Sequence, residues 1–215
     1  MCSIQKMRTN QLSLNLLSQY RQELMGLAML MVVFHHLAIP YMGSAVDFVH
    51  RNGGFGVDIF LLLSGMGLYY SARRGVNLRV FYYKRFVRIF PLYFVIVGVF
   101  QIIYGHTFMD FILKATTIGY WIEGIMYDWF IPNIIALYIL FPVFHFAIFN
   151  RKHGNLIGIA IVAAMYVGIS CLPYGSNFQA WLRWPVFFLG ALTGKWIFAN
   201  GAKSIGGDCP KTIAT

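Results

Sequence analysis

Long runs of apolar residues, separated by short polar stretches, divide the chain into segments. Six runs are long enough, or nearly so, for a transmembrane helix, which needs roughly 20 mainly apolar residues. They cover residues 23–43, 55–72, 89–104, 129–149, 155–173 and 183–200. A weaker stretch at 108–126 contains Asp110, Lys114 and Glu123, and we interpret it as a loop with a short interfacial helix. The pattern predicts an all-α protein, a polytopic transmembrane helical bundle with about six spanning helices.

The composition supports the same class, because 59% of the 215 residues are apolar and only 11% are charged. A soluble domain carries about 25% charged residues. We expect a cytoplasmic N-terminal segment at 1–20, a membrane domain at 21–200 and a polar C-terminal tail at 201–215. The first twenty residues contain no apolar stretch that ends in a small-residue cleavage site, so no cleaved signal peptide is expected.

Basic residues outnumber acidic ones, with 17 Lys and Arg against 7 Asp and Glu and a formal net charge of +10. If the N-terminus is cytoplasmic and six segments cross once each, 14 of the 17 lie on the cytoplasmic side. These are Lys6, Arg8, Arg21, Arg73, Arg74, Arg79, Lys84, Arg85, Arg88, Arg151, Lys152, Lys195, Lys203 and Lys211. The positive-inside preference favours this orientation. The basic residues therefore set membrane orientation, and no nucleic-acid partner is expected.

Two adjacent histidines, His35 and His36, fall in the middle of the first apolar segment, in GLAMLMVVFHHLAIP. An intramembrane histidine needs partners for two nitrogens and is a functional candidate by default. Of the two, we expect one to bond a neighbouring helix and the other to transfer protons, for which histidine is suited near neutral pH. The three cysteines share no close spacing and form no zinc pattern, so no metal site is expected.

Further polar residues lie at or near the ends of other segments. Asp58 begins the second segment and either caps that helix or orients a histidine. On the same helix, Ser64 and its neighbouring glycines favour close helix packing over a nucleophilic role. Arg85 and Arg88 are three residues apart and share one helix face, where their guanidinium groups either bind phosphate or simply belong to a basic cytoplasmic loop.

Arg183 stands at the predicted outer edge of the last segment. It either extends to the lipid interface or contacts an acidic or sugar acceptor, and the sequence leaves both open. Trp121 and Trp129 gather at one predicted water–lipid boundary and are interpreted as part of an aromatic belt.

Several of these segments resemble, in order, the acyltransferase-3 family of bacterial membrane O-acyltransferases. GVDIFLLLSGMGLYY is similar to the family's GVDLFFxLSG pattern, and KRFVRIFPLYF to its RxxR segment. WFIPNIIALYILFPVF and LRWPVFFLG resemble later family helices. The resemblance extends from about residue 20 to residue 194.

The resemblance implies an acyl-CoA co-substrate, a cell-surface polysaccharide or its precursor as acceptor, and no tightly bound cofactor. By position, His36 matches the family's essential histidine, and Arg85 and Arg88 match its arginine pair. Phe141, Pro142 and Val143 match a short FPV motif. His36 and Asp58 would then be catalytic, while His35, Arg85, Arg88 and Arg183 would bind substrates. The resemblance also implies that the protein is a multi-pass protein of the bacterial inner membrane.

The sequence departs from the family at two points. The family's arginine, eleven residues before the histidine, falls on Met25, although Arg21 stands one helical turn earlier. The chain also has about six spans where family members usually have about ten, so we expect a C-terminally truncated member. A second interpretation is therefore a truncated or degenerate non-catalytic membrane module. A third, a small transporter, predicts interrupted helices and paired intramembrane charges, neither of which is apparent.

Overall fold

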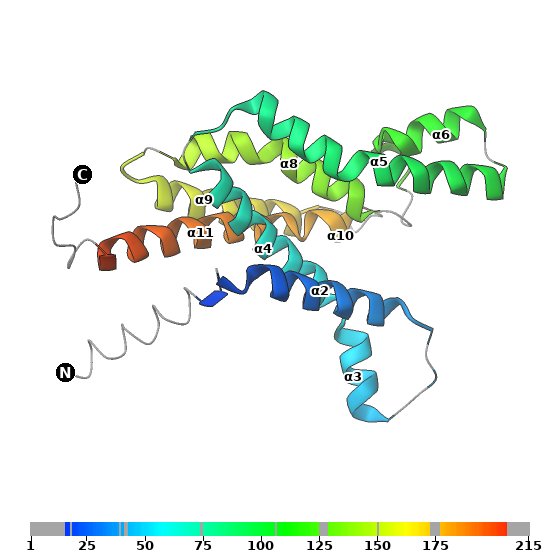
Figure 1. Cartoon of the computed structure of the whole chain (residues 1–215), viewed down its shortest axis with the longest axis horizontal. Coiled ribbons are helices and arrows are strands. Elements are labelled where there is room, and N and C mark those ends of the chain that lie inside the picture. The colour runs from blue at the N-terminus through cyan, green and yellow to red at the C-terminus, as the bar shows by residue number, and fades with distance from the viewer. Residues whose placement is uncertain are drawn as a thin grey trace, which may run out of the picture. The chain divides into compact units, whose positions relative to one another are not determined.

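The computed structural model describes residues 16–17, 19–38, 40, 43–73, 75–105, 107–124, 129–149, 151–172 and 177–205. This part of the chain forms helices and no strand, which confirms the all-α prediction (Figure 1). The helices are α2 (Arg21–His36), α3 (Ser44–Asn52), α4 (Phe55–Ala72), α5 (Leu78–Tyr104), α6 (Phe108–Ala115), α7 (Ile118–Glu123), α8 (Phe130–Ile148), α9 (Gly154–Ser170), α10 (Phe178–Trp181) and α11 (Trp184–Ile205). Most of the predicted N-terminal segment and C-terminal tail lies outside the described residues.

Three described helices, α4, α5 and α8, are long and apolar enough to cross a membrane. At 17 residues, α9 is an apolar helix just short of that length. These four helices contain the apolar runs predicted at 55–72 and 89–104 and most of the runs at 129–149 and 155–173. The run at 183–200 lies within the 22 residues of α11, which also contains Lys195.

The structure differs most from the prediction in three places. The first apolar run does not stay helical to residue 43, because α2 ends at His36 and Leu37 is extended, with φ −72° and ψ 131°. Helix α5 begins at Leu78, well before residue 89, where the Asn77 side chain accepts a hydrogen bond from the backbone N–H of Val80. The weak stretch at 108–126 contains two short helices, α6 and α7, where the sequence predicted one.

The chain forms two compact units, which we describe separately. Unit 1 contains α2, α3, α4 and, from Val186 onward, α11. Unit 2 comprises α5 to α10 with their connections, residues 72–185.

Unit 1 is held together by close approach of helices at small residues. A Cβ atom added to Gly56 of α4 would lie 2.4 Å from the carbonyl oxygen of Ala28 on α2. Added to Gly65, it would lie 2.0 Å from the carbonyl oxygen of Phe187 on α11. Only glycine fits at such contacts, and helices in lipid commonly associate through small residues in this way. The prediction that the small residues of α4 serve packing is confirmed at Gly65.

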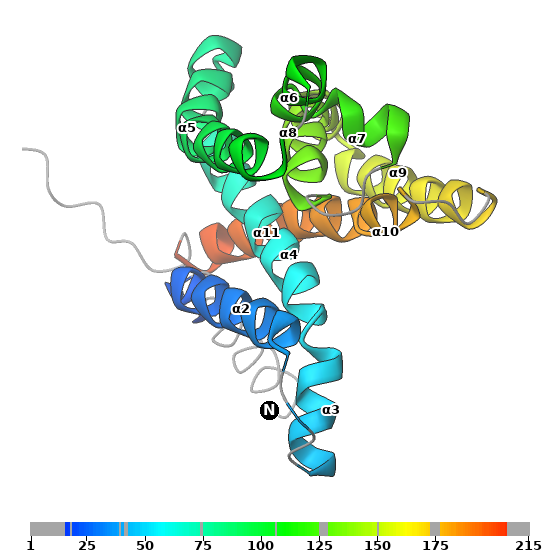
Figure 2. The same ribbon diagram turned by 90° about the vertical axis from the view of Figure 1, so that its right-hand side faces the viewer.

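An apolar cluster lies beside these contacts. Leu63 and Met66 of α4 meet Ile197 of α11, and the partly buried residues packed on them are Leu17, Leu24, Met25, Leu62 and Tyr70. Figure 2 shows α3 leading into α4 with only the turn at Gly53 and Gly54 between them. This short connection fixes α3 close to the beginning of α4.

Unit 2 is built around α5 and α8. The end of α5 packs against α6, where Tyr93, Val97 and Ala115 form a buried cluster and the Tyr93 hydroxyl donates to the carbonyl oxygen of Lys114 at 3.0 Å. Nearer its beginning, α5 meets α8, and the rings of Phe81 and Phe141 stack with centroids 5.8 Å apart. Of the FPV residues, Phe141 and Pro142 are buried, and Val143 is exposed.

Candidate functional site

The histidine pair lies at the C-terminal end of α2 and not in the middle of a longer helix. His36 is the last residue of α2, and the backbone N–H of Leu37 closes the helix on the carbonyl oxygen of Phe34 at 3.2 Å. The prediction that both histidines sit at mid-segment is therefore wrong. Hydropathy could not place this end, because apolar residues continue beyond it in LAIP.

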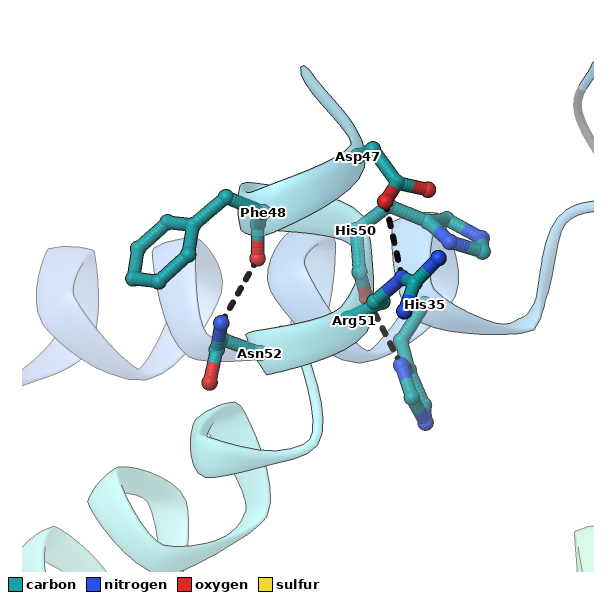
Figure 3. Close-up of polar contacts among 6 residues, drawn as sticks. All are labelled: His35, Asp47, Phe48, His50, Arg51 and Asn52. Carbon is teal, nitrogen blue, oxygen red and sulfur yellow. Dashed lines mark hydrogen bonds and ion pairs between the residues drawn. The ribbon is translucent and has the colours of Figure 1, made fainter. Parts of the chain in front are cut away.

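His35 bonds across to α3. Its Nδ1 lies 2.8 Å from the backbone carbonyl oxygen of His50 (Figure 3). A carbonyl oxygen only accepts hydrogen bonds, so Nδ1 carries the proton, and Nε2 of the neutral ring keeps its lone pair. That nitrogen faces the turn before α4, since a Cβ added to Gly54 would lie 3.7 Å from it.

His36 bonds within its own helix. Its Nδ1 lies 2.8 Å from the carbonyl oxygen of Val32, one turn earlier, and its side chain is exposed. By the same reasoning the neutral ring presents Nε2 as a hydrogen-bond acceptor. The two imidazole rings meet edge to face at 5.3 Å. His35 thus links two helices, while His36 offers an accessible basic nitrogen.

Asp58 occupies the first turn of α4 and is half-buried. A negative charge there is favoured by the helix dipole. Cα–Cβ bonds in a helix tilt toward its N-terminus, so the side chain leans toward the turn that contains Gly54. Asp58 thus stands four residues after Gly54, the residue that lies near His35 Nε2.

Arg21 and Met25 lie on α2 near the opposite end from the histidines. The Arg21 guanidinium lies against the backbone of α4, where a Cβ added to Gly67 would come 2.2 Å from its Nη1. Its Nη1 also lies 3.7 Å from the sulfur of Met25. Met25 itself packs on the apolar cluster of Leu63 and Met66. The guanidinium thus reaches α4 from position 21, while position 25 is occupied by an apolar contact.

In unit 2, Arg85 and Arg88 lie on the early part of α5. The Arg85 guanidinium carbon lies 5.3 Å from the ring centroid of Phe81 and 5.6 Å from that of Tyr138 on α8. Its Nε is buried without a hydrogen-bond partner. Arg88, three residues on, is exposed. The rings of Phe81 and Tyr138 therefore hold the guanidinium of Arg85. The side chain of Arg88 is exposed instead.

Arg183 lies just before α11. Its Nη1 donates to the backbone oxygen of Gln179 at 2.8 Å and to the side-chain oxygen of Gln179 at 2.9 Å. Its guanidinium carbon lies 4.9 Å from the ring centroid of Trp129. The adjacent Trp184 donates through Nε1 to the side-chain oxygen of the fully buried Asn133 at 2.7 Å. Cation, amide and indole groups thus meet at the beginning of α8.

The predicted site residues fall into two sets. His35, His36 and Asp58 belong to unit 1, and Arg85, Arg88 and Arg183 belong to unit 2. Within the described ranges, no group of three or more His, Cys, Asp or Glu side chains could hold a metal ion. The sequence reasoning missed one further residue that contacts the set in unit 1, His50. No local signal marked His50. Gly67, which was predicted with Gly65 to serve helix packing, lies against the guanidinium of Arg21 on α2.

Comparison with known proteins gives a family assignment. Neither the curated proteins nor the solved structures contain a match to this chain. A model of the acyltransferase-3 family, described as an acyltransferase domain, matches residues 24–205. That range includes both histidines, Asp58 and all three arginines. The chain therefore belongs to the acyltransferase-3 family of membrane acyltransferases.

Proposed function

We propose that this chain transfers an acyl group, most simply acetyl, from acyl-CoA to a hydroxyl of a cell-surface polysaccharide or its precursor. His36 is the general base in this proposal. The observation that carries it is the geometry of His36: Nδ1 is held by the Val32 carbonyl oxygen, and the ring is exposed. The lone pair of Nε2 is then available to a substrate hydroxyl.

The chemical step balances with one histidine. Nε2 of His36 accepts the proton of the acceptor hydroxyl as its oxygen attacks the thioester carbonyl carbon. The new C–O bond forms, the C–S bond breaks, and the departing sulfur takes the proton back from the imidazolium. Asp58 supplies negative charge on the neighbouring helix, which would favour the imidazolium as it forms.

Arg85 and Arg88 are proposed to bind the phosphates of the donor. Guanidinium groups bind phosphate oxygens through paired hydrogen bonds. Stacking on Phe81 and Tyr138 holds the Arg85 group in place, so less side-chain entropy is lost when an anion binds. This arrangement favours donor binding over the interpretation of a merely basic loop.

Arg183 is proposed to contact the acceptor. It stands beside the Trp129 ring and the Gln179 amide, and flat apolar rings next to hydrogen-bonding groups suit the mixed surface of a sugar. His35, bonded to α3, would support the site as a neighbour of His36. The proposed setting is the inner membrane of a bacterial cell, with the N-terminus and most basic residues on the cytoplasmic side.

A second candidate is a degenerate, non-catalytic member of the family. Met25 favours it, because an apolar side chain in the unit 1 cluster replaces the arginine that the family pattern has at that position. Arg21 favours the enzyme, since its guanidinium reaches α4 from one turn earlier.

The test is acyl transfer from labelled acyl-CoA in membranes that contain the chain. His36→Asn keeps a side-chain N–H that can reach the Val32 carbonyl but has no basic nitrogen at the Nε2 position, and we expect it to abolish transfer. His153→Ala is the matched control, because His153 is exposed beside α9 and makes no side-chain cap. Full activity of His36→Asn would exclude His36 as the base, and an inactive unsubstituted chain would favour the non-catalytic candidate.

A further inference from the structure

His50 of α3 forms hydrogen bonds with both chain neighbours of His36, namely His35 and Leu37. Its backbone carbonyl oxygen accepts from Nδ1 of His35 at 2.8 Å. Its Nε2 lies 2.9 Å from the backbone carbonyl oxygen of Leu37 and must donate to it. His36 is the residue between these two contacts. Nothing in the sequence pattern singles out His50, and the mechanism proposed above does not use it.

These hydrogen bonds lie at the C-terminal end of α2, where a helix opens most easily. The last carbonyl groups of a helix have no partner within the helix, so helix ends fray unless another group bonds to them. Here the His50 imidazole bonds the carbonyl of Leu37, the first residue beyond α2. The His50 ring also meets Phe34 edge to face, with centroids 5.5 Å apart. Both the backbone and the apolar face of the α2 end are therefore fixed by α3.

We propose that His50 is a positioning residue for His36. By holding residues 35 and 37, it keeps the last turn of α2 closed, and the His36 ring stays bonded to Val32 with Nε2 outward. The effect on catalysis rests on the function proposed above, whereas the effect on the His36 ring does not. His50 needs no contact with substrate for this role.

Two side-chain contacts lie within α3 and supply controls. Asp47 and Arg51 form an exposed ion pair at 2.8 Å, and the side chain of Asn52 donates to the carbonyl oxygen of Phe48 at 2.8 Å (Figure 3). If α3 matters only as a folded helix, loss of these contacts should matter as much as loss of the His50 donor. If the bond to Leu37 matters, only His50 should be sensitive.

The kinetic test compares three variants in the acyl-transfer assay. His50→Phe keeps a ring against Phe34 but removes the donor, and loss of one such hydrogen bond should lower kcat about tenfold with little change in KM for the donor. His50→Gln retains an N–H near the Nε2 position and should restore kcat. Arg51→Gln should leave kcat unchanged. Equal kcat in His50→Phe and the unsubstituted chain, or failure of His50→Gln to restore it, would overturn the proposal.

A second measurement needs no activity. In detergent-solubilised protein with ¹⁵N-labelled histidine, the His36 signals, assigned by their loss in His36→Asn, should report a protonated Nδ1 and an unprotonated Nε2. We expect His50→Phe to mix the two tautomers and His50→Gln to preserve one. An unchanged His36 pattern in His50→Phe would refute the positioning role even if the chain transfers acyl groups. If the unsubstituted chain showed no transfer, the proposed function would fail and this comparison would still decide the role of His50.

Discussion

The contact between α4 and α11 gives the sharpest prediction for stability. A Cβ atom added to Gly65 would lie 2.0 Å from the carbonyl oxygen of Phe187, and one added to Gly190 would lie 2.0 Å from that of Leu62. Real Cβ atoms essentially never approach closer than 3.0 Å. Since both obstacles are backbone atoms, Gly65→Ala or Gly190→Ala must push the two helices about 1 Å apart.

The magnitude follows from that displacement. A gap of 0.5–1 Å forfeits about a quarter to a half of the dispersion energy of each contact it opens. Overpacking of this kind typically costs about 1–3 kcal/mol. A free energy of that size lowers the unfolding temperature of a chain this long by about 2–4 °C per kcal/mol. Each substitution should therefore lower the midpoint by several degrees.

Two other glycines supply matched controls. A Cβ added to Gly98 of α5 or Gly168 of α9 meets nothing within 4 Å. Alanine at these helical positions should stabilise the chain by about 0.5–1 kcal/mol, because glycine loses more backbone entropy on folding. Thermal unfolding of the purified chain in detergent, followed by tryptophan fluorescence, compares all four variants. If Gly65→Ala and Gly190→Ala are as stable as the controls, the close approach of α4 and α11 is refuted.

Three further substitutions test other contacts. Arg85→Lys should raise KM for acyl-CoA more than Arg88→Lys, because only Arg85 loses a planar group stacked on two rings; equal KM values in a donor titration would contradict this. Gly67→Ala should displace the guanidinium of Arg21 and lower both the unfolding temperature and acyl transfer, and unchanged values for both would show that this contact is dispensable. Thr107→Ala removes the side chain that caps α6 and should cost about 1 kcal/mol of unfolding free energy, so an unaltered unfolding curve would count against the cap.

The sequence located the long helices well. The predicted run at 55–72 coincides with α4, and the run at 129–149 differs from α8 by one residue at each end. These runs are mainly apolar and end at polar or glycine-containing stretches, so hydropathy alone nearly fixes their boundaries. Motif order also identified the family, because several weak patterns in the right sequence are jointly specific.

The end of α2 and the existence of α3 could not be predicted in the same way. Apolar residues continue past His36, so hydropathy gives no signal where the helix stops. The carbonyl of Leu37 is bonded by His50, thirteen residues later in the chain. Such a contact depends on how α3 folds back, which a local pattern does not record. The two histidines were therefore recognised as candidates but expected in the middle of a longer helix, whereas α2 ends at His36.

The glycine contacts were predicted only in part. Gly65 was predicted to serve helix packing, but its partner was not identified. The GALTG sequence of α11 carries Gly190 and Gly194 four residues apart, a spacing that puts both on one helix face. Gly190 faces Leu62, and Gly194 faces Met66 and Tyr69. That spacing marks a packing face on α11, although it does not identify α4 as the partner.

The hydrogen bonds of the three histidines connect stability and chemistry at the end of α2. Each ring donates through one nitrogen to a backbone carbonyl: His35 to His50, His36 to Val32 and His50 to Leu37. Because a carbonyl cannot donate in return, every such bond leaves the other nitrogen of a neutral ring as an acceptor. The bonds that join α2 to α3 therefore also specify which nitrogen is basic. A substitution that changes one of these bonds should alter the helix end and the orientation of the base together, and only variants that keep the donor, such as His50→Gln or His36→Asn, can separate the two effects.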